Sequence, residues 1–116
     1  MIATTVSSRK QKGRKLQQEV RDKILTTFEE LSERDVRSTP MGVSGADLML
    51  SEKAFELFPY SVEVKNQEKL NIWASLKQAE SDARDGKPLL IFKRNRSKIY
   101  CALELNDFLE LLRKRE

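Results

Sequence analysis

The chain has 116 residues, of which 39% are hydrophobic and 34% charged, and its formal net charge is +4. Its length predicts one compact domain, and it holds no apolar stretch of the roughly 20 residues that span a bilayer. The N-terminus lacks the apolar core of a signal peptide, so we expect an intracellular, cytoplasmic protein. Because the chain has no histidine, Ser-His-Asp triads, histidine-bound metals and histidine general bases are excluded.

Basic residues gather in three segments, at the two ends of the chain and near residue 95. They are Arg9, Lys10, Lys12, Arg14 and Lys15, then Lys93, Arg94, Arg96 and Lys98, and finally Arg113, Lys114 and Arg115. Such segments bind polyanions, because neutralising phosphates releases their counterions. Taken singly, each segment is explained equally well as a solvated tail or turn that aids solubility.

The first predicted elements are a flexible arm and a long helix. Residues 1–11 are polar, small and basic, which predicts an arm in front of a domain that covers residues 12–116. Residues 14–32 carry apolar side chains at helical spacing and predict an amphipathic helix. These side chains are Leu16, Val20, Ile24, Phe28 and Leu31. Residues 34–43 contain Ser, Thr, Pro and Gly and predict a loop with a short strand at its start.

The rest of the chain alternates between strands and helices. Strands are predicted over residues 46–50, 60–65, 89–92 and 99–103, and helices over residues 70–84 and from a cap at Asn106 onward. The resulting order is helix, strand, strand, helix, strand, strand, helix. This order predicts an α/β fold in which helices flank a mixed central sheet.

Cys101 is the single cysteine of the chain. It can form neither an internal disulfide nor a thiolate zinc site. Because it lies in the apolar run of residues 99–103, we expect a packed, inert thiol rather than a reactive one. The chemistry of this chain must therefore rest on carboxylates, lysines and bound hard cations.

The candidate catalytic pattern of this sequence consists of Asp47, Glu63 and Lys65. Glu63 and Lys65 lie two residues apart on a predicted strand, so their side chains project from the same face. If the strand that carries Asp47 pairs with this one, the two carboxylates converge and repel each other, a conflict that a Mg²⁺ ion resolves. The ion can activate water and neutralise phosphate charge, while Lys65 can orient the water or stabilise charge on the phosphate. By itself, a Glu/Lys pair on a strand is commonplace.

Several short motifs resemble the archaeal-type Holliday junction resolvases, a group within the PD-(D/E)xK nuclease superfamily. They are Lys12-Gly13, Arg37-Ser38, the loop from Ser44 to Asp47, and Val62-Glu63-Val64-Lys65. The resemblance implies a restriction-endonuclease-like core and a homodimer that nicks opposing strands of four-way DNA junctions. It further implies that Asp47, Glu63 and the Val64 carbonyl bind Mg²⁺, with Mn²⁺ as the alternative, and that Lys65 is the catalytic lysine. A phage-encoded enzyme acting in a bacterial host and a cellular enzyme both fit.

The same resemblance implies a set of DNA contacts. The segment from Arg37 to Ser44 resembles a mobile loop that contacts DNA near the cleaved phosphate. Gln78 matches a glutamine found on the helix after the Glu-x-Lys strand, although a solvent-facing glutamine is the alternative. The predicted DNA-binding residues are Arg9, Lys10, Lys12, Arg14, Arg37, Ser38, Ser44 and Gln78. For Trp73 and Phe92, core packing is favoured over stacking on bases or closing a dimer interface.

The sequence departs from the resolvase pattern on its first helix. Resolvases carry a catalytic glutamate there, but the equivalent position holds Gln17, with Glu19 the nearest carboxylate. At about 100° per residue, Gln17 falls within the apolar stripe and Glu19 points away from it. We therefore expect Gln17 to face the site, with its amide oxygen near a water or phosphate. A glutamine bonded to backbone is the alternative, and the neutral side chain leaves open whether one or two metals bind.

Three hypotheses follow from this pattern. The first is a Mg²⁺-dependent endonuclease that resolves four-way junctions. The second is a related nuclease that acts on flaps or duplex DNA, since a fold does not fix a substrate. The third is a non-catalytic DNA-binding protein on the same fold, to which the missing glutamate lends weight.

Overall fold

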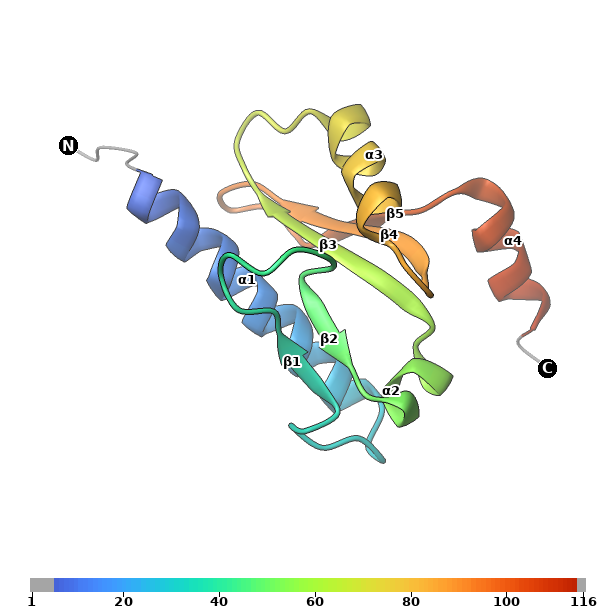
Figure 1. Ribbon diagram of the computed structural model, residues 1–116. Coiled ribbons are helices and arrows are strands. Elements are labelled where there is room, and N and C mark those ends of the chain that lie inside the picture. The colour runs from blue at the N-terminus through green and yellow to red at the C-terminus, as the bar shows by residue number, and fades with distance from the viewer. Residues whose placement is uncertain (1–5, 115–116) are drawn as a thin grey trace.

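The computed structural model describes residues 6–114 and shows the predicted mixed α/β architecture (Figure 1). Its elements are α1 (Val6–Thr27), β1 (Val36–Ser38), β2 (Leu48–Leu50), α2 (Glu52–Leu57), β3 (Tyr60–Asn66), α3 (Ile72–Asp82), β4 (Lys87–Lys93), β5 (Tyr100–Ala102) and α4 (Leu105–Arg113). The predicted fold class is therefore confirmed. Within the described residues, no helix is long and apolar enough to cross a membrane.

A three-stranded sheet of mixed orientation forms the centre of the molecule. Its strand order is β3-β4-β5, with β3 parallel to β4 and β5 antiparallel to β4. A parallel pair needs a crossover connection, which α3 provides between β3 and β4. In the register of this pair, Glu63 lies beside Leu90 and Val64 beside Ile91.

The two faces of this sheet are covered by different helices. Side chains alternate along a strand, so Val62 and Val64 of β3 share a face. They belong to the same buried cluster as Leu16, Val20 and Ile24 of α1, which confirms the predicted apolar stripe of that helix. The intervening residue, Glu63, projects to the other face, where α3 packs on β3 and β4.

The strand that follows Asp47 does not join the three-stranded sheet by ladder pairing. β2 pairs antiparallel with β1, with Val36 opposite Leu50, and the two form a separate ribbon. Asp47 itself contacts β3 through a backbone hydrogen bond of 2.8 Å from Asp47 N to Val62 O and one of 2.7 Å from Val64 N to its carboxylate. The strand pairing that was the condition for bringing the two carboxylates together does not form as a ladder, and these two bonds hold Asp47 at β3 in its place.

The long first helix is shifted toward the N-terminus relative to its prediction. It begins at Val6, so residues 6–11 are helical rather than part of an arm, and residues 1–5 lie outside the described residues. Arg, Lys and Gln are good helix formers, and extending an existing helix adds one hydrogen bond per residue. The helix ends at Thr27, so Leu31 lies in the turn after the helix rather than in it, and its side chain is buried there. The β-branched Thr26 and Thr27 have low helix propensity.

Four other local expectations are wrong. The short helix α2 was not predicted, and Glu104 rather than Asn106 caps α4, accepting a hydrogen bond of 3.0 Å from Asp107 N. Trp73 is 82% exposed on the outer side of α3, and Cys101 is exposed on β5. β5 forms the edge of the three-stranded sheet, so its side chains gain burial only from one neighbouring strand.

Candidate active site

The loop before β2 places Asp47 beside β3. Gly45 adopts a positive φ of 111°, which other residues rarely tolerate, and the chain then turns into β2. Thr39 fixes this loop, because its hydroxyl donates to Ala46 O at 2.6 Å and its N–H donates to Asp47 O at 2.9 Å. The Asp47 carboxylate accepts a hydrogen bond of 2.7 Å from Val64 N. Main-chain groups therefore hold Asp47 in a fixed position.

Glu63 is a buried carboxylate with one free oxygen. The residue is only 3% exposed, and its Oε1 atom has no hydrogen-bond partner within the described residues. The Oε2 atom lies 3.5 Å from Lys65 Nζ, so the predicted neighbourhood of Glu63 and Lys65 on one face of the strand is confirmed. A buried polar atom without a partner is costly and marks a place where a further ligand is favoured.

The pKa values of both site carboxylates, Asp47 and Glu63, are raised. Burial raises the pKa of Glu63 to about 7; the charge of Asp47 adds to this, while Lys65 opposes it. Burial also raises the pKa of Asp47, offset in part by the Val64 N–H and by Lys65. Each carboxylate disfavours ionisation of the other, which a bound cation would relieve.

Asp82, the last residue of α3, is a neighbour that the sequence analysis missed. Its negative charge raises the pKa values of both Asp47 and Glu63, and a side-chain hydrogen bond with Asp82 also raises that of Glu63. A signal for it exists in the sequence, since Asp82 follows Gln78 by four residues and so lies on the same side of the helix. The site therefore receives negative charge from the loop before β2, from β3 and from α3.

A cleft of about 620 Å³ collects most of the predicted site residues. Its lining includes Lys10, Arg14, Gln17, Ser38, Asp47, Glu63, Val64, Lys65 and Gln78. Gln17 is partly buried in this cleft and Glu19 is exposed, as the helix geometry predicted. Residues from α1, β1, β3 and α3 thus converge on one concave surface.

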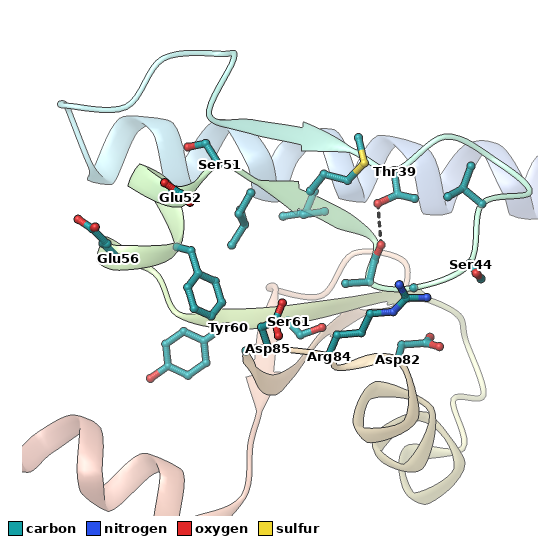
Figure 2. Close-up of a pocket in the computed structure, with 18 residues that line it drawn as sticks. Thr39, Ser44, Ser51, Glu52, Glu56, Tyr60, Ser61, Asp82, Arg84 and Asp85 are labelled. Atoms are coloured by element: carbon teal, nitrogen blue, oxygen red, sulfur yellow. Dashed lines mark hydrogen bonds between the residues drawn. The ribbon is translucent and has the colours of Figure 1, made fainter.

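Four of the predicted DNA-binding residues do not line this cleft. Arg9 on α1 and Arg37 on β1 are exposed. Lys12 lies 3.7 Å from Glu68, with which it forms an ion pair. Ser44 lines a second pocket instead (Figure 2).

The second pocket has the wrong charge for nucleic acid. It measures about 730 Å³, and Figure 2 shows Glu52, Glu56, Asp82 and Asp85 around it, with Arg84 as the basic residue. An acidic lining repels phosphates, whereas the cleft with Lys10, Arg14 and Lys65 attracts them. Of the two hollows, the smaller one fits a polyanionic substrate.

The donor set of the cleft fits Mg²⁺. Nowhere in residues 6–114 do three His, Cys, Asp or Glu side chains gather as a metal-binding group. Mg²⁺ does not need such a cage, because it keeps several waters and is bound through one or two carboxylates together with substrate phosphates. Asp47 and Glu63 supply two carboxylates, and the unpartnered Glu63 Oε1 can serve as an oxygen donor.

The fold and the site together define a nuclease of the PD-(D/E)xK class. An aspartate after a glycine loop meets a Glu-x-Lys strand on a mixed sheet, behind a long first helix, as in restriction endonucleases. The chain belongs to the family described as "Phage putative PDDEXK endonuclease", whose model matches residues 8–116. Nucleases of this class usually use divalent metals. The description gives a phage origin and names no junction substrate, and no curated protein or solved structure gives a match.

Proposed function

We propose that this chain is a metal-dependent endodeoxyribonuclease that nicks opposing strands of four-way DNA junctions by phosphodiester hydrolysis. The observation that carries the proposal is the meeting of Asp47, Glu63 and Lys65 in a cleft with basic walls. The junction as substrate, rather than DNA in general, rests on the resemblance of the short motifs to resolvases. Cutting two opposing strands requires two sites, so a homodimer is part of the proposal.

Asp47 and Glu63, with the Val64 carbonyl, would hold Mg²⁺ or alternatively Mn²⁺. A divalent cation there supplies Lewis acidity toward a phosphodiester and lowers the pKa of water. Lys65 Nζ, 3.5 Å from Glu63 Oε2, is placed to hold the attacking water or to neutralise charge on the phosphate. Gln17 and Gln78 lie in the same cleft, where their amides can hydrogen-bond to that water or to phosphate oxygens.

A basic surface beside the cleft supports a nucleic-acid substrate. Glu68 accepts a hydrogen bond of 2.6 Å from Asn95 N and lies 3.7 Å from Lys12 Nζ. It thereby joins the basic half of α1 to the basic turn between β4 and β5, at one end of the molecule (Figure 1). Two segments that are far apart in the sequence therefore share one surface, which fits a phosphate backbone.

The predicted contacts outside the cleft belong to the same proposal. Arg9 and Arg37 are exposed and free to reach phosphates, and Ser44 lies on the exposed part of the loop before Asp47. The Ser38 hydroxyl lines the cleft and has no hydrogen-bond partner within residues 6–114. A phosphate oxygen or a bound water can supply that partner.

A cleavage assay with a labelled four-way junction tests the proposed function. Purified protein should nick the junction in Mg²⁺, and EDTA should stop the reaction. A linear duplex of the same sequence, competing in moderate salt, should be cut more slowly, because non-specific binding weakens steeply as salt rises. Equal cutting of both substrates would favour a related nuclease acting on duplex or flap DNA.

The neutral Gln17 favours a second candidate, a DNA-binding protein that does not cleave. Position 17 faces the cleft but offers no charge for a metal. Binding of a junction without any metal-dependent nicking, across Mg²⁺ and Mn²⁺, would support this candidate. If the Gln17→Glu variant then nicks the junction in the presence of metal, the missing carboxylate is the reason that the wild type does not.

A further inference from the structure

Two aromatic side chains lie on one face of the sheet, at the end where β4 turns into β5. Phe92 of β4 is paired in register with Tyr100 of β5, so both side chains project to the same face. Their ring centroids are 6.3 Å apart, with an interplanar angle of 32°. In the register of β3 and β4, Phe92 lies beside Lys65, so this is also the face on which α3 packs.

Trp73 adds a third ring from the first turn of α3. The segment before α3 is attached to the same end of the sheet, because Gln67 N donates a hydrogen bond of 3.1 Å to Lys93 O. At about 100° per residue, Trp73 is turned roughly 140° away from Gln78, which lines the cleft. The cleft lies beside β3, so Trp73 lies on the opposite flank of α3, toward β4 and β5.

The rings of this aromatic surface, which consists of Trp73, Phe92 and Tyr100, are largely open to solvent. Trp73 is 82% exposed and Tyr100 is 55% exposed, while Phe92 is half-buried and supports the ring of Tyr100. Exposed aromatic area that is gathered in one place on a soluble protein marks a site of interaction. The core packing expected for Trp73 is therefore replaced by a role at the surface.

The charges around the aromatic surface indicate which partner it fits. The turn between Phe92 and Tyr100 contains Lys93, Arg94, Arg96 and Lys98 and no acid. On α3, the exposed Lys77 lies one turn from Trp73 on the same side, and the nearest acid on that side, Glu80, lies two turns away. Aromatic rings among basic side chains fit single-stranded nucleic acid, because bases stack on the rings while phosphates meet the cations.

We propose that this aromatic surface binds unpaired nucleotides of the DNA substrate, with bases stacked on Trp73 and Tyr100. The inference rests on the proposed function in one respect, that the substrate is DNA. The cleft and the aromatic surface lie on the two flanks of α3, and the exposed Lys69 lies in the loop that precedes this helix. A strand bound in the cleft can therefore continue past the start of α3 to the aromatic surface. Unpaired bases occur where strands separate at a branch point and not within a linear duplex, so this surface favours branched DNA.

The fluorescence of Trp73, the single tryptophan of the chain, tests the stacking directly. A short oligothymidylate, titrated into the full chain in EDTA, should quench this fluorescence as a base stacks on the indole ring. A deoxyribose-phosphate oligomer of the same length keeps the phosphates but lacks the bases, and should leave the fluorescence almost unchanged. Binding of oligothymidylate without quenching, or equal quenching by the oligomer without bases, would overturn the proposal.

Ring-removing variants test the same surface through affinity. Trp73→Ala and Tyr100→Ala should each weaken the binding of a dye-labelled oligothymidylate by roughly tenfold, measured by anisotropy. Tyr100→Phe keeps the ring and should bind as the wild type does. Phe108→Ala removes a 42% exposed ring from α4 and is the matched control, with an expected affinity equal to that of the wild type. Unchanged affinity of either alanine variant would overturn the proposal.

The binding assays contain no metal, so they separate this inference from the proposed nuclease activity. Quenching by oligothymidylate in a chain that does not nick DNA would count against the proposed function and support the aromatic surface. Nicking of junctions by a chain whose fluorescence does not respond to oligothymidylate would have the opposite meaning.

Discussion

Asp47 is held across the segment of β3 that carries Glu63, and this places the two carboxylates together. Its N–H donates to Val62 O on one side of Glu63, while its carboxylate accepts from Val64 N on the other side. A rigid main chain therefore fixes the spacing of the two acids, and side-chain freedom plays little part. Sites fixed in this way lose little entropy when they bind a cation or a substrate.

Neutralising either carboxylate should remove cleavage and spare binding. Asp47→Asn and Glu63→Gln each keep the shape of the side chain but remove a charge that a divalent cation needs. We expect the rate of nicking to fall by at least about a hundredfold, with the affinity for DNA nearly unchanged in EDTA. Gel-based cleavage and fluorescence anisotropy measure the two quantities separately. Glu19→Gln, an exposed acid on α1, is the control and should cut normally.

The raised pKa of Glu63 should make stability depend on pH and metal together. The folded-state pKa of about 7 lies above the value of 4.5 expected for an unfolded glutamate, so the folded protein holds this proton more tightly. This group therefore stabilises the fold below about pH 4.5, and its contribution is lost as pH rises toward 7. Mg²⁺ should raise the melting temperature more at about pH 8 than at about pH 5.5, where protons compete with the ion.

Calorimetry with and without Mg²⁺ at both pH values measures this effect. The Glu63→Gln variant provides the control, because its side chain does not titrate and its metal-dependent shift should be small at either pH. A Mg²⁺ shift that is equal at both pH values in the wild type would show that Glu63 does not bind the ion.

The residues of the site differ in how far the sequence predicts them. The face shared by Glu63 and Lys65 follows from the two-residue period of a strand, and the inward position of Gln17 follows from the helical period. The environments of Trp73 and Cys101 were predicted wrongly, because apolar character alone does not say whether a neighbouring element covers a side chain. Asp82 escaped notice because its approach to Glu63 depends on how α3 packs on β3.

At the scale of elements, apolar periodicity located the strands and long helices but not their ends. α1 extends to Val6 because polar helix formers precede its apolar stripe, and α2 is too short to show a helical period. The helix predicted over residues 70–84 already stops at Asp82 in α3. The role of Gly86, in the segment that follows, is shown only by the packing of two strands.

Gly86 allows the start of β4 to lie against the start of β3. A Cβ at this position would lie 2.8 Å from both Ser61 N and Tyr60 C, which are backbone atoms that cannot easily move. Gly86→Ala should therefore destabilise the fold by about 1–3 kcal/mol. Gly13→Ala is the contrasting case, since nothing lies within 4 Å of its Cβ position on α1. It should stabilise the protein by about 0.5–1 kcal/mol, and urea unfolding measures both values.

At the scale of the molecule, the order of elements predicted the α/β class, whereas the partners of the strands could not be predicted. The sequence left open whether the segment after Asp47 pairs with β3, and β2 pairs instead with β1, the strand that precedes it in the chain. The alternation of side chains along a strand does not say which neighbouring strand will pair with it. The convergence of α1 with the β4–β5 turn is equally invisible in the sequence, because Glu68 joins them across distant positions.

The basic surface that the first half of α1 and the β4–β5 turn share should determine how DNA binding responds to salt. Each phosphate contact that is lost makes the slope of log K against log salt shallower by about 0.9 for duplex DNA. Replacing Arg94→Gln and Arg96→Asn removes two exposed charges from the β4–β5 turn, and asparagine suits the positive φ of 65° at position 96. The slope should therefore become shallower by about 2.

Lys23→Gln with Arg34→Gln is the control, because it removes the same charge from exposed positions at the other end of α1 and beyond it. This double variant should leave the slope unchanged. Anisotropy titrations in EDTA measure binding without cleavage. Equal slopes for both double variants would show that net charge alone attracts DNA. The surface that Glu68 joins, from α1 and the β4–β5 turn, would then not be the binding surface.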